Sequence, residues 1–313
     1  MKLLGVTPPH RTVSRRSFLG AAALLPLAGC AQDPTPVSAP VDTAAPTSTP
    51  AAVPHDHLIE LERKFDARLG VYAVATGTGT TLAYRADEPF AFCSTFKGLA
   101  AAAVLHRNPL SHLDTVVTYT EDDLMASSAV TRRHVATGMT IRQVCDAAVR
   151  HSDGTAGNLL LRDLGGPAAL TAYARGLGDT VTRSDRFEPD LTTAVPGDPR
   201  DTTSPRAIGV DYQRIVLGDA LGPDQRAFLR DLLERNATEA GAHRVRAGVP
   251  RGWAVADKTG TGGYGTVNDI AVVWPPDAAP LVISIMSSKA TADAARDQAL
   301  LAEAAAYAVG ALT

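Results

Sequence analysis

The chain has 313 residues, of which 45% are hydrophobic and 5% aromatic, and its formal net charge is −3. This length is enough for one large domain, or for two closely packed lobes with a proper core. Sparse aromatics and the lack of a long basic run argue against nucleic acid as a partner. The histidines are scattered and neither a CxxC pair nor an HExxH motif occurs, so we expect no metal site and no cofactor.

Residues 1–29 have the organisation of an export signal. Arg15 and Arg16 precede an apolar stretch, residues 18–29, which is too short to span a bilayer. Paired arginines before such a stretch are typical of a twin-arginine signal. The stretch ends in LAGC, which resembles a bacterial lipobox, so we expect lipidation at Cys30. The alternative is an ordinary cleavage site, which would leave the protein secreted.

Residues 30–54 are rich in Pro, Ala, Thr and Ser. Such a segment cannot bury enough apolar surface to fold, and it favours extended conformations. We therefore expect a tether that joins a cell-envelope lipid anchor to a folded domain over residues 55–313. The lipid anchor is then the only expected contact with a membrane.

Two β-like runs open this domain, LGVYAVAT (residues 69–76) and TTLAYRA (80–86), and the glycine-rich GTG between them predicts a hairpin. Three further strand-like runs, at 253–260, 268–275 and 280–288, precede an alanine-rich helix over residues 291–312. Between them, from about residue 94 to 236, apolar residues recur at helical spacing, as in TIRQVCDAAVRH and PDQRAFLRDLLERN.

The N-terminal and C-terminal strands are therefore expected to share one antiparallel sheet with the terminal helices on its face. The expected sheet lobe spans about residues 55–93 and 237–313, and the expected helical lobe about 94–236. A site is expected in the cleft between the lobes. Cys93 and Cys145 lie in apolar helical contexts, which favours two buried free thiols over a disulfide bridge.

The stretch FCSTFKGLAAAAVL, residues 92–105, places Ser94 three residues before Lys97 at the start of an apolar helix. Residues at i and i+3 are neighbours on a helix surface. A serine hydroxyl is a poor nucleophile until a base takes its proton, and a desolvated lysine can be that base. The S-x-x-K pattern alone is weak, because an N-capping serine beside a solvated lysine has the same spacing.

Two further motifs strengthen the catalytic interpretation. Residues 151–161, HSDGTAGNLLL, supply three polar residues at a predicted helix start: Ser152, Asp153 and Asn158. Residues 256–265, ADKTGTGGYG, supply a polar strand end: Lys258, Thr259, Gly260 and Thr261. The motifs S-x-x-K, S-D-x and K-T-G in this order are the set found in class A β-lactamases and penicillin-binding proteins.

On these motifs, residues 56–313 resemble a class A serine β-lactamase of the branch that carries S-D-G in place of S-D-N. RFEPDL (186–191) and PGDPRDTTSP (196–205) look like the Ω-loop of that family. The resemblance implies a two-lobed α/β fold, in which helices flank a five-stranded antiparallel sheet and the active site lies beside an all-helical lobe. It also implies hydrolysis of a small-molecule β-lactam, a cyclic amide, by a monomer that confers resistance.

The resemblance also implies roles for individual residues. Ser94 attacks the lactam carbonyl, and Lys97 accepts its proton. Glu188 activates the water that hydrolyses the acyl-enzyme. Ser152 relays a proton to the lactam nitrogen with help from Lys258. The backbone N–H groups of Ser94 and Thr261 form the oxyanion hole.

The remaining implied residues bind the substrate or support the catalytic groups. Those expected to bind substrate are Lys258, Thr259, Gly260, Thr261, Gly154 and Arg246, although Arg244 is close enough in sequence to be confused with Arg246. The supporting residues are Asp153, Asn158, Arg186, Asp201 and Thr192. Gly154 and Thr192 stand where most relatives have Asn, which removes one contact to the substrate amide and one to the deacylation water.

Two other functions remain open from the sequence. A D,D-peptidase with the same S-x-x-K and K-T-G machinery would lack a deacylating glutamate, and RFEPDL argues against it. A slow acyl-trapping β-lactam binder would result if Thr192 failed to position the water. A membrane-bound β-lactam sensor ranks last, because such sensors need transmembrane and cytoplasmic segments.

Overall fold

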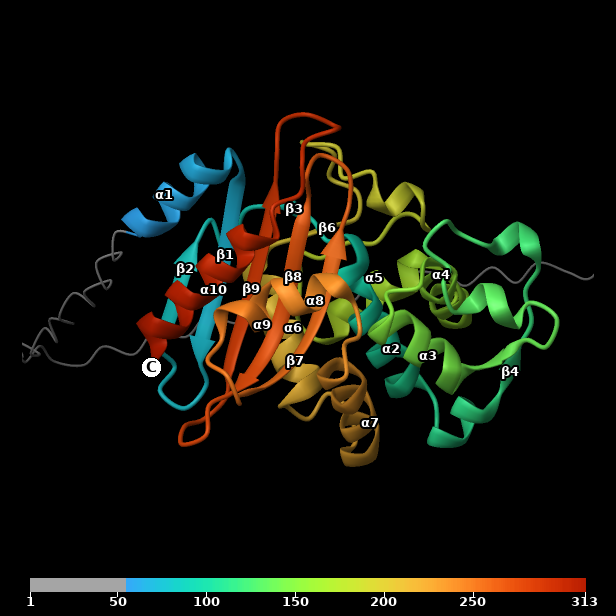
Figure 1. Ribbon diagram of the computed structural model, residues 1–313. Coiled ribbons are helices and arrows are strands. Elements are labelled where there is room, and N and C mark those ends of the chain that lie inside the picture. The colour runs from blue at the N-terminus through green and yellow to red at the C-terminus, as the bar shows by residue number, and fades with distance from the viewer. Residues whose placement is uncertain (1–54) are drawn as a thin grey trace, which may run out of the picture. The chain divides into compact units, whose positions relative to one another are not determined.

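The computed structural model describes residues 55–313 (Figure 1). The expected signal, the tether and Cys30 lie outside these residues. The described part is built around a five-stranded sheet of order β2-β1-β9-β8-β7, in which every neighbouring pair is antiparallel. The strands are β1 (Arg68–Ala75), β2 (Thr81–Tyr84), β7 (Ala254–Thr261), β8 (Val267–Trp274) and β9 (Leu281–Ser288).

This sheet confirms the expected pairing of N-terminal and C-terminal strands. β1 and β2 form the predicted hairpin, and Gly79 in its turn has a φ of +75°, which favours glycine. β1 also pairs along its whole length with β9, more than 200 residues later in the chain, from Arg68 opposite Ser288 to Ala75 opposite Leu281. The central strands read as continuous apolar runs because both of their faces are covered.

Two hydrophobic clusters cover the two faces. Alternate residues of one strand, such as Val71 and Tyr72, belong to different clusters, as the strand period of two requires. One face carries α1 (Asp56–Phe65), α8 (Glu239–His243), α9 (Val245–Gly248) and α10 (Gln298–Leu312), and the other carries α6 (Pro205–Val216) (Figure 1). α10 starts seven residues later than the sequence pattern predicts.

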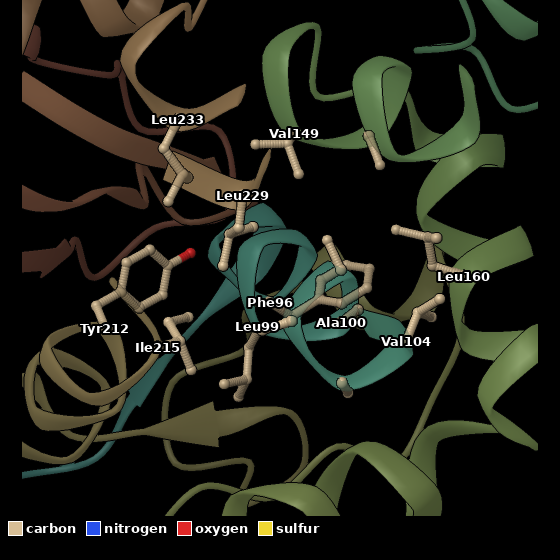
Figure 2. Close-up of a cluster of buried hydrophobic side chains, with 14 of the residues drawn as sticks. Phe96, Leu99, Ala100, Val104, Val149, Leu160, Tyr212, Ile215, Leu229 and Leu233 are labelled. Atoms are coloured by element: carbon tan, nitrogen blue, oxygen red, sulfur yellow. The ribbon is translucent and has the colours of Figure 1, made fainter. Parts of the chain in front are cut away.

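The helical part is centred on α2 (Phe96–Arg107), whose residues from Phe96 to Leu105 are all buried. Around it pack α3 (Ile141–Arg150), α4 (Gly154–Leu164), α5 (Pro167–Gly176) and α7 (Pro223–Glu234). Figure 2 shows Val149, Leu160, Ile215 and Leu229 converging on this helix from its neighbours. Burial of each such side chain stabilises the fold by about 1.5–3 kcal/mol. This packing holds α2 in place next to the serine that precedes it.

Short elements make the middle of the chain less uniformly helical than its pattern predicts. β3 (Phe90–Ala91) pairs with β6 (Thr202–Thr203), and β4 (Val116–Val117) pairs with β5 (Met139–Thr140). Five 3₁₀ turns span Cys93–Thr95, Leu110–Asp114, Glu121–Asp123, Thr131–His134 and Asp190–Thr192. Segments this short carry no periodicity that a sequence pattern can reveal. Cys93 and Cys145 are buried free thiols.

Candidate active site

A cavity of about 340 Å³ lies where the edge strand β7 meets the helical part. Its lining residues come from both sides: Ser94, Ser127, His151, Ser152, Glu188, Thr192, Thr238, Ala240, Thr259 and Thr261. A larger cavity of about 990 Å³ lies on the other side of the Ω-loop, beside α1 and β9. We assign the smaller cavity as the candidate site, because Ser94, Ser152 and Glu188 line it and two buried lysines contact these side chains from behind.

The turn that carries Ser94 is tied to the surrounding elements. Cys93 has a φ of +47°, a left-handed conformation that is costly for a non-glycine residue. Asn268 of β8 donates to the carbonyl of Phe92 at 3.2 Å, and Tyr212 of α6 donates to the carbonyl of Thr95 at 2.7 Å. The turn is therefore fixed from the sheet and from α6 together.

Lys97 is fully buried and its side-chain nitrogen contacts three oxygens. Its Nζ lies 2.9 Å from Ser94 Oγ, 2.9 Å from Glu188 Oε1 and 2.8 Å from the carbonyl oxygen of Ser152. Ser94 Oγ also lies 3.2 Å from Glu188 Oε1. A proton leaving Ser94 thus has two acceptors within reach, which is the geometry that nucleophile activation needs.

Gly157, which the sequence analysis did not single out, makes room for Lys97. A Cβ atom at this position would lie 2.5 Å from Lys97 Cε, closer than non-bonded atoms approach. A larger residue here would force the lysine stem or α4 to shift. No sequence signal marks this role, because the contact joins two helices.

Ser152 and Lys258 form the second polar pair. Ser152 has a φ of +54° just before α4, and Lys258 Nζ donates to its Oγ at 3.0 Å and to the carbonyl of Thr259 at 2.9 Å. Burial, and next the charge of Lys97, lower the pKa of Lys258 to about 7. Both protonation states of Lys258 are therefore populated near neutral pH, which suits a group that passes protons.

Asp153 caps the start of α4 and has no contact with the reacting groups. Its carboxylate accepts from the backbone N–H groups of Val130, Thr131 and Ala156, and from the Thr131 hydroxyl. The position next to Ser152 is thereby anchored to the loop before α3. This is the structural role that the sequence interpretation gives to Asp153.

Glu188 is positioned through its own backbone. Asn158 Oδ1 accepts from the Glu188 N–H at 2.9 Å, and Asn158 Nδ2 donates to the Glu188 carbonyl at 2.9 Å. This two-way bond sets the carboxylate beside Lys97 without using either carboxylate oxygen. Thr192 lines the same cavity, but its hydroxyl donates to the carbonyl of Pro189 at 2.8 Å.

The ends of the Ω-loop are joined by an ion pair. Arg186 Nε lies 2.5 Å from Asp201 Oδ2, and Asp201 Oδ1 accepts from the N–H groups of Asp185 and Arg186. Asp201 is fully buried, and these hydrogen bonds replace those that its carboxylate would otherwise make to water. The closure places Glu188 over the cavity.

The expectation that Arg246 contacts the substrate is wrong. Its guanidinium pairs with buried Asp257 at 2.6 Å and donates to the carbonyls of Leu233, Glu234 and Val255, so it is committed to joining α7 to β7. Burial raises the pKa of Asp257 while the charge of Arg246 opposes that rise. Arg246 does not line the cavity.

Arg244, and not Arg246, contacts a residue that lines the cavity. Its Nη2 donates to Thr261 Oγ1 at 2.7 Å, and its Nη1 donates to the carbonyls of Gly260 and Asn268 at 2.6 and 2.7 Å. Because Thr261 Oγ1 accepts from Arg244, its hydroxyl proton is free to point into the cavity. Burial lowers the pKa of Arg244 to about 10, so it stays protonated at neutral pH.

Gly154 lies beside Glu188 at the start of α4, and the space next to it is already filled. A Cβ atom there would lie 2.4 Å from Ser127 Oγ and 2.7 Å from Glu188 Oε2. Ser127 belongs to the loop before α3 and was not anticipated from the sequence, because a serine in a polar loop gives no pattern. It lines the cavity and is exposed to solvent.

Two further properties of residues 55–313 bear on the chemistry. Among them, no group of three or more His, Cys, Asp and Glu side chains is placed to bind a metal ion. No helix in this part of the chain is both long and apolar enough to cross a membrane.

Comparison with known proteins gives a consistent result. Residues 55–312 match the family described as "Beta-lactamase enzyme family". The chain is 54% identical over 310 residues to a β-lactamase of Mycobacterium tuberculosis. The aligned region covers 97% of this chain and 99% of that protein. It is 56% identical over 268 residues to a β-lactamase of Amycolatopsis lactamdurans, with 84% and 88% covered.

Solved structures agree in fold. The β-lactamase of Streptomyces albus G has a TM-score of 0.79 and 48% identity, with 82% of this chain and 98% of that chain covered. A class A β-lactamase of Clostridium kluyveri has a TM-score of 0.80 and 42% identity, with 82% and 97% covered.

Proposed function

Because the chain belongs to the β-lactamase enzyme family, we propose that it is a class A serine β-lactamase that hydrolyses penicillins and cephalosporins through an acyl-enzyme on Ser94. The observation that carries this proposal is the triangle of Ser94 Oγ, Lys97 Nζ and Glu188 Oε1, whose sides measure 2.9, 2.9 and 3.2 Å. It brings a nucleophile, a buried lysine nitrogen and a carboxylate together, and the serine and the carboxylate line the cavity.

In the acylation step, Ser94 Oγ attacks the lactam carbonyl carbon and gives up its proton. Lys97 or Glu188 receives that proton, since both lie within hydrogen-bond distance of Ser94 Oγ. The backbone N–H groups of Ser94 and Thr261 stabilise the oxyanion; removing one such donor typically costs about 10²–10³ in rate.

The C–N bond of the lactam then breaks, and the ring nitrogen needs a proton. Ser152 Oγ is placed to deliver it, because Lys258 donates to that oxygen at 3.0 Å and can replace the proton that leaves. The pKa of Lys258 near 7 supports this exchange at neutral pH. The product of this step is an ester between Ser94 and the opened substrate.

In the deacylation step, Glu188 takes a proton from a water molecule that attacks the ester carbonyl. Ser94 Oγ leaves with a proton, which restores the enzyme and releases a penicilloic-type acid. The two-way bond between Asn158 and the Glu188 backbone supports this role by limiting the motion of the carboxylate. Thr192 supplies a hydroxyl oxygen beside it, whose own proton is directed to Pro189.

The carboxylate that β-lactams carry is bound at the opposite end of the cavity. The Thr259 and Thr261 hydroxyls and the charge of Lys258 are placed for it, and Arg244 orients Thr261 from behind. Gly260 contributes through its backbone, whose carbonyl accepts from Arg244. Arg244 therefore replaces Arg246 in the set of residues proposed to recognise substrate.

We extend the proposal to the N-terminal residues, which lie outside the described part. Residues 1–29 act as a twin-arginine signal, Cys30 carries the lipid, and residues 30–54 connect it to the enzyme. The enzyme then works as an exported monomer at the cell envelope, where it protects its host from β-lactams. Supporting this, Arg15-Arg16, the short apolar stretch and LAGC occur in the order that such signals have.

The test follows purified protein with a chromogenic cephalosporin while intact mass is recorded in parallel. The proposal predicts steady turnover with little trapped adduct, and a loss of roughly 10⁴–10⁶ in rate for Ser94→Ala. A single stoichiometric burst with a persistent adduct would instead indicate a D,D-peptidase-like or acyl-trapping protein. Full activity in Ser94→Ala would refute the serine mechanism.

A further inference from the structure

Asp211 is a buried acid that the proposed mechanism does not use. It lies on α6 and is fully buried, yet no donor among residues 55–313 bonds to either of its carboxyl oxygens. An ionised carboxylate in such a place is costly unless it is paired or hydrogen-bonded. A buried acid without donors therefore keeps its proton.

The group that Asp211 faces is a second buried acid, Asp179. Asp179 Oδ1 accepts from the Val181 N–H at 2.6 Å and from the Thr182 N–H at 3.0 Å, and the carboxyl group of Asp211 lies within hydrogen-bond distance of Asp179. Two adjacent buried carboxyl groups cannot both be ionised. Because Asp179 already accepts from two N–H groups, the proton belongs to Asp211, which donates it to Asp179.

The surroundings of Asp211 hold this proton in place. Burial, and next the charge of Asp179, raise the pKa of Asp211 from 3.8 to about 9, and the charges of two arginines oppose that rise without donating to Asp211. One of them, Arg214, lies close to the turn before Asp179, since its Nη1 is 2.8 Å from where a Cβ of Gly178 would stand. The titratable and charged groups that face Asp211 are Tyr173, Arg175 and Asp179 before the Ω-loop, and Tyr212 and Arg214 on α6 itself.

Both ends of the Ω-loop are attached to α6. The exit of the loop runs through Thr203 into Ser204, whose Oγ caps the start of α6. The entry follows Asp179, and Thr182 Oγ1 lies 2.6 Å from Thr203 Oγ1. Asp211 lies about two turns into α6, so its bond to Asp179 holds the entry segment on the helix that also carries the exit.

We propose that Asp211 and Asp179 share one proton at neutral pH, and that this acid pair is a second closure of the Ω-loop, which weakens at alkaline pH. Loss of the proton to solvent leaves two carboxylates facing each other, so the entry segment moves away from α6. This closure does not depend on the reaction proposed for Ser94.

The pH dependence of unfolding tests the shared proton. Asp211 loses its proton near pH 3.8 in the unfolded chain and near pH 9 in the folded protein, so between these values the unfolded state binds fewer protons. Stability must therefore fall as pH rises through this window. Asp211→Asn keeps a donor toward Asp179 but cannot ionise. From about pH 5 to pH 8, the urea unfolding constant of the unmodified protein should rise about tenfold per pH unit relative to that of the variant. The same pH dependence in both proteins would overturn the proposal.

Infrared spectra at neutral pH report the proton itself. The C=O stretch of a protonated carboxyl group should be present in the unmodified protein and weaker by one carboxyl group in Asp211→Asn. Asp257 and Asp269, whose pKa values burial also raises, occur in both proteins and cancel in the difference spectrum. Tyr173→Phe removes the other buried oxygen near Asp211 and should keep both the band and the pH dependence. A band unchanged in Asp211→Asn, or lost in Tyr173→Phe, would overturn the assignment.

Limited cleavage by trypsin tests the link to the Ω-loop. Arg183 is exposed and follows Asp179 by four residues in the entry segment. The ionised fraction of Asp211 should rise from about a tenth at pH 8 to about three quarters at pH 9.5. Cleavage after Arg183 should then rise about five- to tenfold in the unmodified protein relative to Asp211→Asn, because cleavage follows the open population. Equal rates in the two proteins at both pH values would overturn the closure. None of these measurements uses a β-lactam, so their outcome is independent of the proposed function.

Discussion

The two walls of the cavity are built in different ways. The β7 wall places Lys258, Thr259 and Thr261 on a strand that is paired with β8 along its whole length, and Arg244 braces it from behind. The opposite wall places Glu188 on a loop with only a 3₁₀ turn of its own, from Asp190 to Thr192. A few side-chain bonds, chiefly those of Asn158 and Asp201, hold that loop in place.

This difference separates the two half-reactions. Apart from Glu188 as an alternative acceptor of the Ser94 proton, the residues proposed for acylation and substrate binding lie on α2, on β7 and on the residues just before α2 and α4, so they are fixed by the core. Glu188, the residue proposed for deacylation, is held in position by the Arg186–Asp201 ion pair of the Ω-loop and by Asn158. Damage to the loop should therefore slow deacylation while acylation continues, and damage to the β7 wall should weaken substrate binding first.

Asp201→Asn tests the loop wall and should have the largest effect. The substitution removes the charge that faces Arg186 and replaces one accepting oxygen by an amide NH₂ group, which is a donor facing donors, so the Ω-loop should lose its closure. A shift of about 1 Å in a catalytic group can cost about 10²-fold in rate. We expect a full burst of acylation followed by steady turnover about 100-fold slower, measured by stopped-flow with a chromogenic cephalosporin. Equal slowing of burst and steady phases would contradict the separation of the walls.

Arg244→Ala and Arg246→Ala form a matched pair on the β7 wall. Loss of Arg244 leaves the Thr261 hydroxyl unoriented, so KM should rise about 10- to 100-fold, the range for charge-assisted bonds. Loss of Arg246 leaves Asp257 unpaired in the core and should lower the free energy of unfolding by about 3–5 kcal/mol. KM of the folded Arg246→Ala enzyme should change less than threefold. A large rise in KM for Arg246→Ala, with little change for Arg244→Ala, would support Arg246 as the substrate-binding arginine.

The titration of Lys258 should make substrate recognition at the β7 wall depend on pH. Its pKa of about 7 means that the ammonium form predominates below that pH and the neutral amine above it. Since the cation attracts the substrate carboxylate, kcat/KM should fall as pH rises through about 7, by at most about tenfold per pH unit. Lys258→Arg stays charged and should lack this alkaline limb, even where its absolute rate is lower. The same limb in both enzymes would assign it to another group.

The sequence predicted the placement of functional residues well where they form short motifs on or beside a regular helix or strand. Ser94 and Lys97, Ser152 and Asp153, and the Lys258–Thr261 segment are short motifs, and the strand and helix periods around them predict their placement. The five strands of the sheet were predicted within a residue or two, because each is an apolar run that ends in a turn.

Sequence reasoning failed where the structure decides between near neighbours. Arg244 and Arg246 are two residues apart, and the break between α8 and α9 turns one toward Thr261 and the other toward Asp257. Gly157 and Ser127 matter because of atoms supplied by distant segments, Lys97 in one case and Gly154 in the other. No local pattern reports such contacts, since they depend on how the helices pack.

The most direct test of the central claim is the intact mass of Glu188→Ala after mixing with benzylpenicillin. The account predicts a protein increased by the mass of one whole penicillin on Ser94, stable for many minutes, with steady turnover reduced by about 10²–10⁴-fold. The unmodified enzyme should show almost no adduct under the same conditions. Rapid turnover by Glu188→Ala without an adduct would contradict the assignment of deacylation to the loop wall.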